Sequence, residues 1–296
     1  MITPHNHGAR DETGARGVAG GRSLRLRIAS AVVLAPLVIA AAYLGGWCFL
    51  FLCALGAGGI FWEWTRLVSG RSDPRLLVPG WAALAAAVAL VGASTPGAAV
   101  GAIGAGAVLA GVAAVAGIAR NFERRGAWAA AGVIYAGVAF LGPALLRRDN
   151  EFGFQAFLFL AVTVWLTDVF AYAVGRTIGG PLLWPQVSPN KTWAGAIGGL
   201  AGGVAGGTLV AYAGGMGRLA VVGVIALLLS ALAQVGDLVE SAIKRRFGAK
   251  DTSHLIPGHG GLMDRLDGFL VAAFAALVIG ILHQGTYAPA RGLLVW

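Results

Sequence analysis

The sequence has little charge and almost no cysteine. Asp, Glu, Lys and Arg make up 12% of its 296 residues, whereas about 25% is usual in soluble proteins. This shortage excludes a soluble domain with a charged surface, and the high apolar content excludes a disordered chain. Cys48 and Cys53 fit neither a C-x-x-C pair nor a zinc pattern, so we interpret them as small packing residues.

Two nucleotide-binding motifs are also missing. The sequence contains no G-x-x-x-x-G-K-[ST] phosphate loop, and no dinucleotide fingerprint follows a plausible strand. Soluble nucleotide-binding folds therefore receive no support.

Apolar residues are what the sequence has in excess, at 57% with 47 glycines in addition. Apolar runs recur from residue 28 to the C-terminus and lack the alternation of a membrane β-barrel. They predict an all-α, polytopic membrane protein with about nine transmembrane helices. The expected spans are 28–44, 47–62, 78–93, 98–118, 128–146, 154–174, 194–213, 219–236 and 267–282. We divide the chain into a flexible basic tail (1–27), N-terminal spans (28–150) and a C-terminal region with the motif loops (151–296).

The 22 Lys and Arg residues are distributed unevenly over the two sides of such a bundle. With nine spans, all but Arg147, Arg148, Arg218 and Arg291 fall on the same side as the basic tail. The positive-inside rule therefore places the N-terminus and the motif loops in the cytoplasm. The net charge of +9 is explained by the basic residues that orient the protein in a cell membrane, so we expect no nucleic-acid partner. In a bacterium this membrane would be the inner membrane.

Glycine is concentrated in the run 194–213. One row repeats every four residues and a second row runs beside it: Gly195, Gly199, Gly203 and Gly207, then Gly198, Gly202 and Gly206. Such rows let helices approach closely in lipid. They favour either a homodimer interface or packing within the chain.

Polar residues are densest between Ser230 and Asp267. On a helix one polar stripe is formed by Ser230, Gln234, Asp237, Ser241 and Lys244. Such a stripe faces a site or a partner helix, because facing lipid would be costly.

Two further carboxylates, Asp264 and Asp267, lie one turn apart at the start of the last span. We predict that Asp237 and Asp264 converge across the intervening loop and bind Mg²⁺, alone or with a second cation. Asp267 is the candidate third ligand. The alternative is that Asp264 and Asp267 cap a helix and pair with Arg265 or Lys250.

Cations and glycines lie between these carboxylates. The cations are Lys244, Arg245, Arg246 and Lys250, and the loop 257–261 reads PGHGG. Bases can hold phosphates, and glycines let backbone N–H groups approach an anion. Together with metal-binding acids they indicate phosphoryl or nucleotidyl transfer. Taken alone, the four bases could equally anchor a span at the cytoplasmic surface.

This region resembles the phosphatidate cytidylyltransferases, or CDP-diacylglycerol synthases. Thirteen positions of their C-terminal signature are matched in register: Ser241, Lys244, Arg245, Lys250, Asp251, Pro257, Gly258, His259, Gly260, Gly261, Asp264, Arg265 and Asp267. Shorter elements upstream also match: Q-x-G-D (Gln234, Gly236, Asp237), S-P-x-K-T-W-x-G (Ser188, Pro189, Lys191, Thr192, Trp193, Gly195) and D-x-x-A-Y-x-x-G (Asp168, Ala171, Tyr172, Gly175). Many members of the family have Glu where this chain has Ala194. Residues 1–150 match only in general character, as at Arg27 and Glu63-Trp64.

The resemblance implies transfer of CMP from CTP to phosphatidate, giving CDP-diacylglycerol and pyrophosphate. It assigns catalysis to Asp237, Asp264, Lys244 and Lys250, with Mg²⁺ at Asp237, Asp264 and Asp267. Binding of the two substrates falls to Ser188, Lys191, Ser241, Arg245, His259, Gly260, Gly261 and Arg265. We expect His259 to hydrogen-bond or position the loop, since the anionic lipid phosphate needs no general base. Asp168, inside an apolar span, either contacts metal or pairs with Arg176.

Three other classes of protein explain the sequence less well. A transporter would explain the spans and the buried acids, but not the clustered bases and the PGHGG loop on one side. A CDP-alcohol phosphotransferase would carry a D-G-x-x-A-R…G-x-x-x-D-x-x-x-D motif, which is absent. A purely structural assembly protein has the least support.

Overall fold

The computed structural model describes residues 32–70, 73–115, 126–253, 255 and 260–296, so the predicted tail (1–27) lies outside the described residues. Within them, eight helices are long and apolar enough to cross a membrane, and a shorter apolar helix, Val32–Leu44, precedes them. The eight are α2 (Gly46–Ser69), α3 (Pro74–Gly92), α4 (Pro96–Val115), α5 (Gly126–Arg147), α6 (Gly153–Ile178), α7 (Trp193–Ala213), α8 (Leu219–Arg246) and α9 (Met263–Gln284). The prediction of an all-α, multi-pass membrane protein is confirmed, with nine as an approximate count.

Several helices run further than their apolar stretches predicted. α8 continues to Arg246, ten residues beyond the expected end of its span. α2 continues to Ser69 and ends at Gly70, whose φ of 82° closes the helix in the left-handed region. Both extensions carry charged residues that find partners in the protein, so hydropathy alone ended these helices too early.

Three short elements were not expected from the apolar pattern. β1 (Leu182–Trp184) and β2 (Ser188–Thr192) form an antiparallel pair between α6 and α7, and α10 (Pro289–Leu294) follows α9. β2 leads directly into α7, where the Thr192 hydroxyl caps the helix by accepting a 3.1 Å hydrogen bond from Gly195 N. Lys191 therefore lies two residues before the first residue of α7, next to the capping Thr192.

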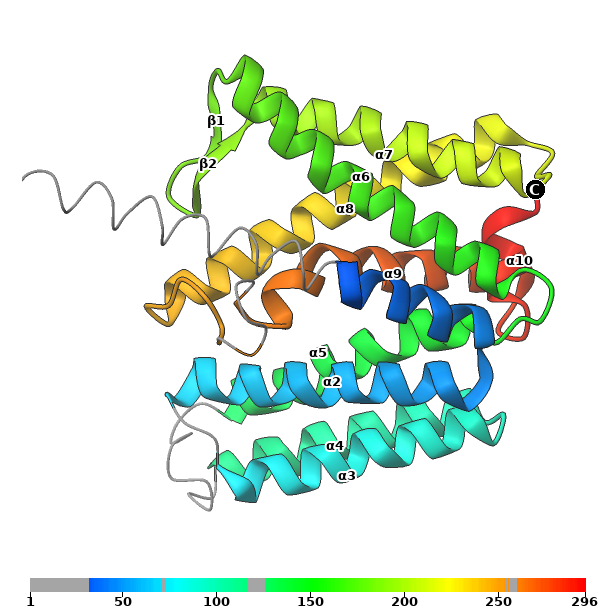
Figure 1. The fold of residues 1–296 in the computed structure, drawn as a ribbon. Coiled ribbons are helices and arrows are strands. Elements are labelled where there is room, and N and C mark those ends of the chain that lie inside the picture. The colour runs from blue at the N-terminus through cyan, green and yellow to red at the C-terminus, as the bar shows by residue number, and fades with distance from the viewer. Residues whose placement is uncertain (1–31, 71–72, 116–125, 254, 256–259) are drawn as a thin grey trace, which may run out of the picture.

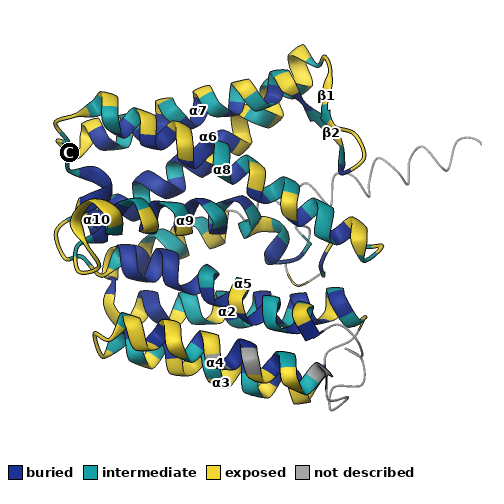
Figure 2. Cartoon of the chain, turned by 180° about the vertical axis from the view of Figure 1, so that it is seen from behind, coloured by how far each residue is buried: buried dark blue, intermediate teal, exposed yellow. Residues whose placement is uncertain are grey.

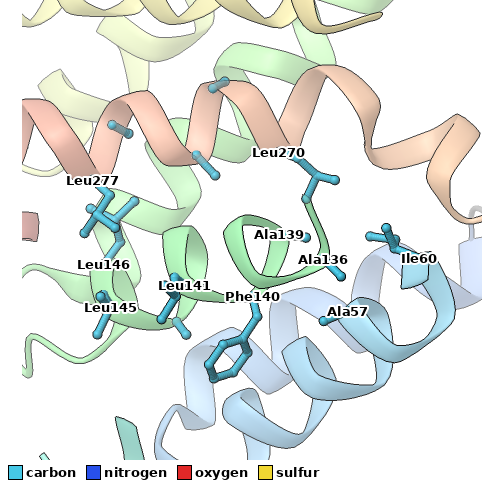
Figure 3. Packing of buried hydrophobic residues seen from close by; sticks show 14 of the residues in the cluster. Ala57, Ile60, Ala136, Ala139, Phe140, Leu141, Leu145, Leu146, Leu270 and Leu277 are labelled. Carbon is cyan, nitrogen blue, oxygen red and sulfur yellow. The ribbon is translucent and has the colours of Figure 1, made fainter. Parts of the chain in front are cut away.

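α5 is the central helix of the bundle. In its most apolar stretch 72% of residues are buried, compared with 31–39% in the other seven long helices. Its Ala136, Phe140 and Leu146 lie in one cluster with residues of α2 and α9 (Figure 3). Gly142 lets α5 and α9 approach each other closely, since an added Cβ would lie 3.0 Å from the Ala273 carbonyl carbon. Exposed residues are instead frequent along the outer helices, as expected for faces that contact lipid (Figure 2).

Both glycine rows of α7 are used within the chain. A Cβ at Gly203 would collide with Thr167 Oγ1 and Ser230 Oγ, and a Cβ at Gly202 would overlap Phe170. The Thr167 and Ser230 hydroxyls lie 2.7 Å apart and join α6 to α8 beside this row. Of the two interpretations of the glycine rows, the structure therefore shows packing within the chain.

Candidate active site

The charged residues of the motifs gather at one end of the helix bundle. Figure 1 shows the β1–β2 pair, the C-terminal end of α8 and the start of α9 at the same end, opposite the C-terminus. The described parts of the loop between α8 and α9, residues 247–253, 255 and 260–262, belong to this end. The topology therefore brings together motifs that lie up to 79 residues apart, from Ser188 to Asp267.

Asp237 of α8 forms an ion pair with Lys191 of β2. Ser241, one turn further along α8, donates a 3.4 Å hydrogen bond to Asp237 Oδ1. The side chains of Lys191 and Asp237 keep 29% and 33% of their exposure, so the pair is accessible from outside the protein. An accessible pair of opposite charges can exchange its internal contact for a charged ligand.

The polar stripe of α8 faces other elements of the protein, as predicted. Ser230 meets Thr167 of α6, and Gln234 donates to the carbonyl oxygen of Ala196 in α7 at 3.2 Å. Asp237 continues the stripe toward β2. Ser230 and Gln234 thus hold α6, α7 and α8 together. The residues of the stripe from Asp237 to Lys244 form part of the site.

Lys244 connects α8 to α9. Its ammonium group donates to Asp264 Oδ1 at 2.7 Å and to Glu240 Oε1 at 3.1 Å. Lys244 and Glu240 are both buried, at 9% and 1% exposure. Tyr135 of α5 adds a long 3.5 Å hydrogen bond to the other oxygen of Glu240. Lys244 is therefore a buried cation balanced by two carboxylates, and the third proton of its ammonium group has no acceptor among the described residues.

Asp264 also holds the α8–α9 loop. Its Oδ2 accepts hydrogen bonds from Thr252 N at 2.9 Å, Thr252 Oγ1 at 3.0 Å and Gly261 N at 3.0 Å. The cation that contacts Asp264 is Lys244, which the alternative of a pairing with Arg265 or Lys250 did not name. Asp264 thus orders both ends of the loop while its Oδ1 faces Lys244.

Glu63 of α2 approaches the same loop from the N-terminal part of the chain. It is fully buried and accepts hydrogen bonds from Ser253 Oγ at 2.5 Å, Met263 N at 2.7 Å and Leu262 N at 2.8 Å. The Thr252 hydroxyl, which bonds Asp264, lies 3.3 Å from Glu63 Oε2 as well. Two acids from different ends of the chain therefore share one loop.

Asp237 and Asp267 are brought near each other by a close crossing of α8 and α9. An added Cβ at Gly236 would lie 3.0 Å from Asp267 O, and one at Gly268 would lie 2.8 Å from Ala233 O. The carboxylates of Asp168, Asp237 and Asp267 are close enough to interact electrostatically with one another. Asp168 is also close enough to interact with Lys191 and Arg265. Arg176, its suggested partner, donates instead to the Tyr172 hydroxyl at 2.8 Å.

The remaining predicted site residues lie around this centre. Lys250, Arg245 and Arg265 are exposed, and Ser188 is half-buried in β2. Gly260 has a φ of 88°, a conformation that favours glycine, and an added Cβ at Gly261 would collide with Thr252 Oγ1. The prediction for His259, with those for Pro257 and Gly258, lies outside the described residues.

The expected convergence of Asp237 and Asp264 stays a prediction. The structure joins each of them to a different lysine, Lys191 and Lys244, at the same end of the bundle. Among the described residues, no three His, Cys, Asp or Glu side chains are grouped as a metal site. Mg²⁺ sites commonly use one or two carboxylates and complete their shell with water and substrate phosphates.

Fold and site together define a multi-pass membrane protein with a cluster of acids and bases at one end, suited to phosphate chemistry. A family model described as the cytidylyltransferase family matches residues 25–282. The phosphatidate cytidylyltransferases of Brucella suis and Brucella melitensis are each 43% identical over 276 residues, covering 90% of this chain and 97% of the relative. That of Bacillus subtilis is 38% identical over 141 residues, 46% of this chain and 51% of the relative. The chain belongs to the cytidylyltransferase family, and the predicted resemblance is confirmed.

Glu63, Glu240 and Thr252 were not among the predicted site residues. Glu240 had a signal, since it stands four residues before Lys244 on the same helix, the spacing of a helical ion pair. Glu63 had a weaker one, as an acid beside an apolar run. Thr252 had none, because only the folded loop brings it to Asp264.

Proposed function

We propose that this chain transfers CMP from CTP to phosphatidate, releasing pyrophosphate and leaving CDP-diacylglycerol in the membrane. The observation that carries the proposal is the gathering of Lys191, Asp237, Lys244 and Asp264 at one end of the bundle of a cytidylyltransferase-family chain. The lipid phosphate is already an anionic nucleophile, so no Ser-His pair is required. The main obstacle is repulsion between that phosphate and the triphosphate.

The cations of the site can offset this repulsion between phosphates at two places. Arg245, Lys250 and Arg265 are exposed at this end of the bundle, and their side chains are long enough to contact the phosphates of an incoming substrate. Lys191 and Ser188 on β2 serve a second anion from the facing side. Buried Lys244 orients Asp264, and its third N–H, which has no acceptor among the described residues, would donate to a phosphate oxygen.

A Mg²⁺ ion, with or without a second cation, fits the donor set of Asp237, Asp264 and Asp267. Each of these carboxylates has an oxygen with at most one donor among the described residues. For Asp237 Oδ1 this donor is Ser241 at 3.4 Å, and for Asp264 Oδ1 it is Lys244 at 2.7 Å. Asp267 accepts one hydrogen bond at Oδ1, from Gly268 N at 2.7 Å, and its Oδ2 has no donor among the described residues. Mutual repulsion among Asp168, Asp237 and Asp267 also favours a cation between them. When bound, Mg²⁺ would neutralise triphosphate charge and make the α-phosphorus more electrophilic.

The site end of the bundle faces the cytoplasm in this proposal, where CTP is available, and the N-terminus lies on the same side. The uneven distribution of Lys and Arg supports this orientation, and the relatives' bacterial sources support an inner membrane. The lipid headgroup then meets the site at the membrane surface. A homodimer would use a face other than the glycine rows of α7, because those rows contact α6 and α8.

One assay tests the reaction and separates it from transport. Purified protein is incubated with phosphatidate, Mg²⁺ and CTP labelled at the α-phosphorus, and in a parallel sample at the γ-phosphorus. We expect α-label in the lipid phase as CDP-diacylglycerol and γ-label in water as pyrophosphate. If no α-label enters the lipid, and the protein reconstituted in vesicles instead takes up labelled CTP, the result would favour a transporter.

A further inference from the structure

We propose that Glu63 of α2 is a positioning residue, which fixes the α8–α9 loop so that Asp264 is held in its working place. This inference rests on the proposed function for its effect on turnover, but its structural part can be tested separately. Among the described residues, the hydrogen-bond partners of Glu63 are Thr252, Ser253, Leu262 and Met263, none of which is assigned to substrate binding. It acts on the reaction through the groups that it holds.

The contacts of Glu63 join two segments of the loop that are ten residues apart. Ser253 Oγ and Leu262 N donate to its Oε1, at 2.5 and 2.8 Å, and Met263 N donates to its Oε2 at 2.7 Å. Leu262 and Met263 mark the start of α9, whose first helical N–H groups have no partner inside the helix. A carboxylate at this end satisfies two of them and fixes where α9 begins.

Asp264 follows Met263 directly, so the position of α9 sets the position of this carboxylate. The link is also direct, because the Thr252 hydroxyl lies 3.0 Å from Asp264 Oδ2 and 3.3 Å from Glu63 Oε2. Gly261 fits between the two acids: an added Cβ would lie 2.9 Å from Glu63 Oε1 and 2.9 Å from Asp264 Oδ2. Glu63, Thr252 and Asp264 thus form one packed unit.

The charge of Glu63 needs an explanation that packing alone does not provide. A fully buried carboxylate is costly, and its four donors in the described part of the chain are neutral hydroxyl and amide groups. An apolar side chain of similar size would fill the space but leave the N–H groups of Leu262 and Met263 without an acceptor. Glu63 therefore holds the loop by accepting hydrogen bonds, and it does so from α2, a helix outside the C-terminal signature.

Substitution by Gln separates the acceptor role from volume. The Gln amide has one oxygen, so one of the two backbone N–H groups at the start of α9 would face an NH₂ group. Glu63→Asp keeps both acceptor oxygens on a shorter side chain. The matched control is Glu151→Gln, because Glu151 is exposed in the loop before α6, at the opposite end of the bundle.

The test measures turnover and hydrogen exchange on the full chain in detergent, well below the unfolding temperature of each variant. For Glu63→Gln we expect kcat to fall about tenfold to a hundredfold, the Mg²⁺ concentration for half-maximal rate to rise several-fold, and KM for CTP to change by less. Glu63→Asp should recover part of kcat, and Glu151→Gln should match the unmodified protein. Amide exchange in the peptide that contains Leu262, Met263 and Asp264 should be at least tenfold faster in Glu63→Gln.

If Glu63→Gln lowers thermal stability but leaves exchange in this peptide, kcat per folded molecule and Mg²⁺ dependence unchanged, the proposal is wrong. Should Glu63→Gln fail to fold, Ser253→Ala removes one donor from Glu63 and should still accelerate exchange and lower kcat about threefold; no change in either would also overturn it. If the unmodified protein shows no CMP transfer while Glu63→Gln accelerates exchange, the proposed function fails and the anchoring role stands.

Discussion

Lys191, two residues before the start of α7, pairs with Asp237, nine residues before the end of α8. The pair joins β2 to α8 and remains partly exposed, which suits a contact that opens when an anionic substrate arrives. Neither residue has another ion-pair partner among the described residues.

Asp237→Asn should reduce CMP transfer about a hundredfold, a loss typical of removing one group that stabilises transition-state charge. Because Asp237 is a third exposed, its loss should change the unfolding temperature little. Turnover and thermal unfolding of the purified variant measure the two effects. Near-normal turnover would remove Asp237 from the set of catalytic residues.

Lys244→Met should destabilise the protein by about 3 kcal/mol, because it leaves two buried carboxylates, Glu240 and Asp264, without their cation. Chemical unfolding in detergent measures this loss. Lys250→Met is the control, since Lys250 is exposed and its removal should leave the unfolding free energy unchanged. Equal stability of the two variants would contradict the arrangement around Lys244.

Gly261→Ala should lower kcat at least tenfold, because the added methyl group collides with the Thr252 hydroxyl and crowds both Glu63 and Asp264. Gly217→Ala is its control: no atom lies within 4 Å of a Cβ at this position, in the turn before α8. Steady-state rates of both variants test the prediction. A fully active Gly261→Ala enzyme would show that the loop tolerates displacement.

Gly203→Ala should destabilise the bundle by about 1–3 kcal/mol through overpacking against Thr167 and Ser230. Gly56→Ala in α2, where an added Cβ meets nothing within 4 Å, should be neutral or slightly stabilising. The comparison uses unfolding midpoints in the same detergent. If Gly203→Ala is as stable as Gly56→Ala, α6, α7 and α8 are not packed as tightly as this structure has them.

Chelation of divalent cations should abolish CMP transfer, and Mg²⁺ should restore it better than the larger Ca²⁺ does. The measurement is the rate of label entering lipid after treatment with EDTA and titration with each ion. A rate that survives exhaustive chelation would exclude a required divalent cation at Asp237, Asp264 and Asp267.

The sequence predicted the helices well because lipid imposes a strong local rule: about 20 apolar residues form a span. It predicted less at the helix ends. The run that ended at residue 236 became a helix to Arg246, since Asp237, Glu240 and Lys244 are neutralised by contacts that hydropathy does not record. Periodicity correctly placed the polar stripe of α8 on one face.

The candidate site was only partly predictable for the same reason. The motif residues carry their chemistry in the sequence, but Glu63 reaches Met263 across 200 positions, and no local pattern signals such a contact. The pairing of Asp264 with Lys244 was missed because both Arg265 and Lys250 were nearer in sequence. In the folded loop Thr252 bonds one oxygen of Asp264 and Lys244 bonds the other, and neither contact follows from distance along the sequence.

α5 comes from the N-terminal part of the chain, yet α9, which carries Asp264 and Asp267, packs directly on it through Gly142 and Ala273. During synthesis α5 is complete more than a hundred residues before α9 emerges, so the last long helix docks on a partner that already lies in the membrane. A fragment that begins at residue 151 would insert α9 with this small-residue face turned to lipid. The order of translation therefore builds the scaffold first and the acidic end of α9 last.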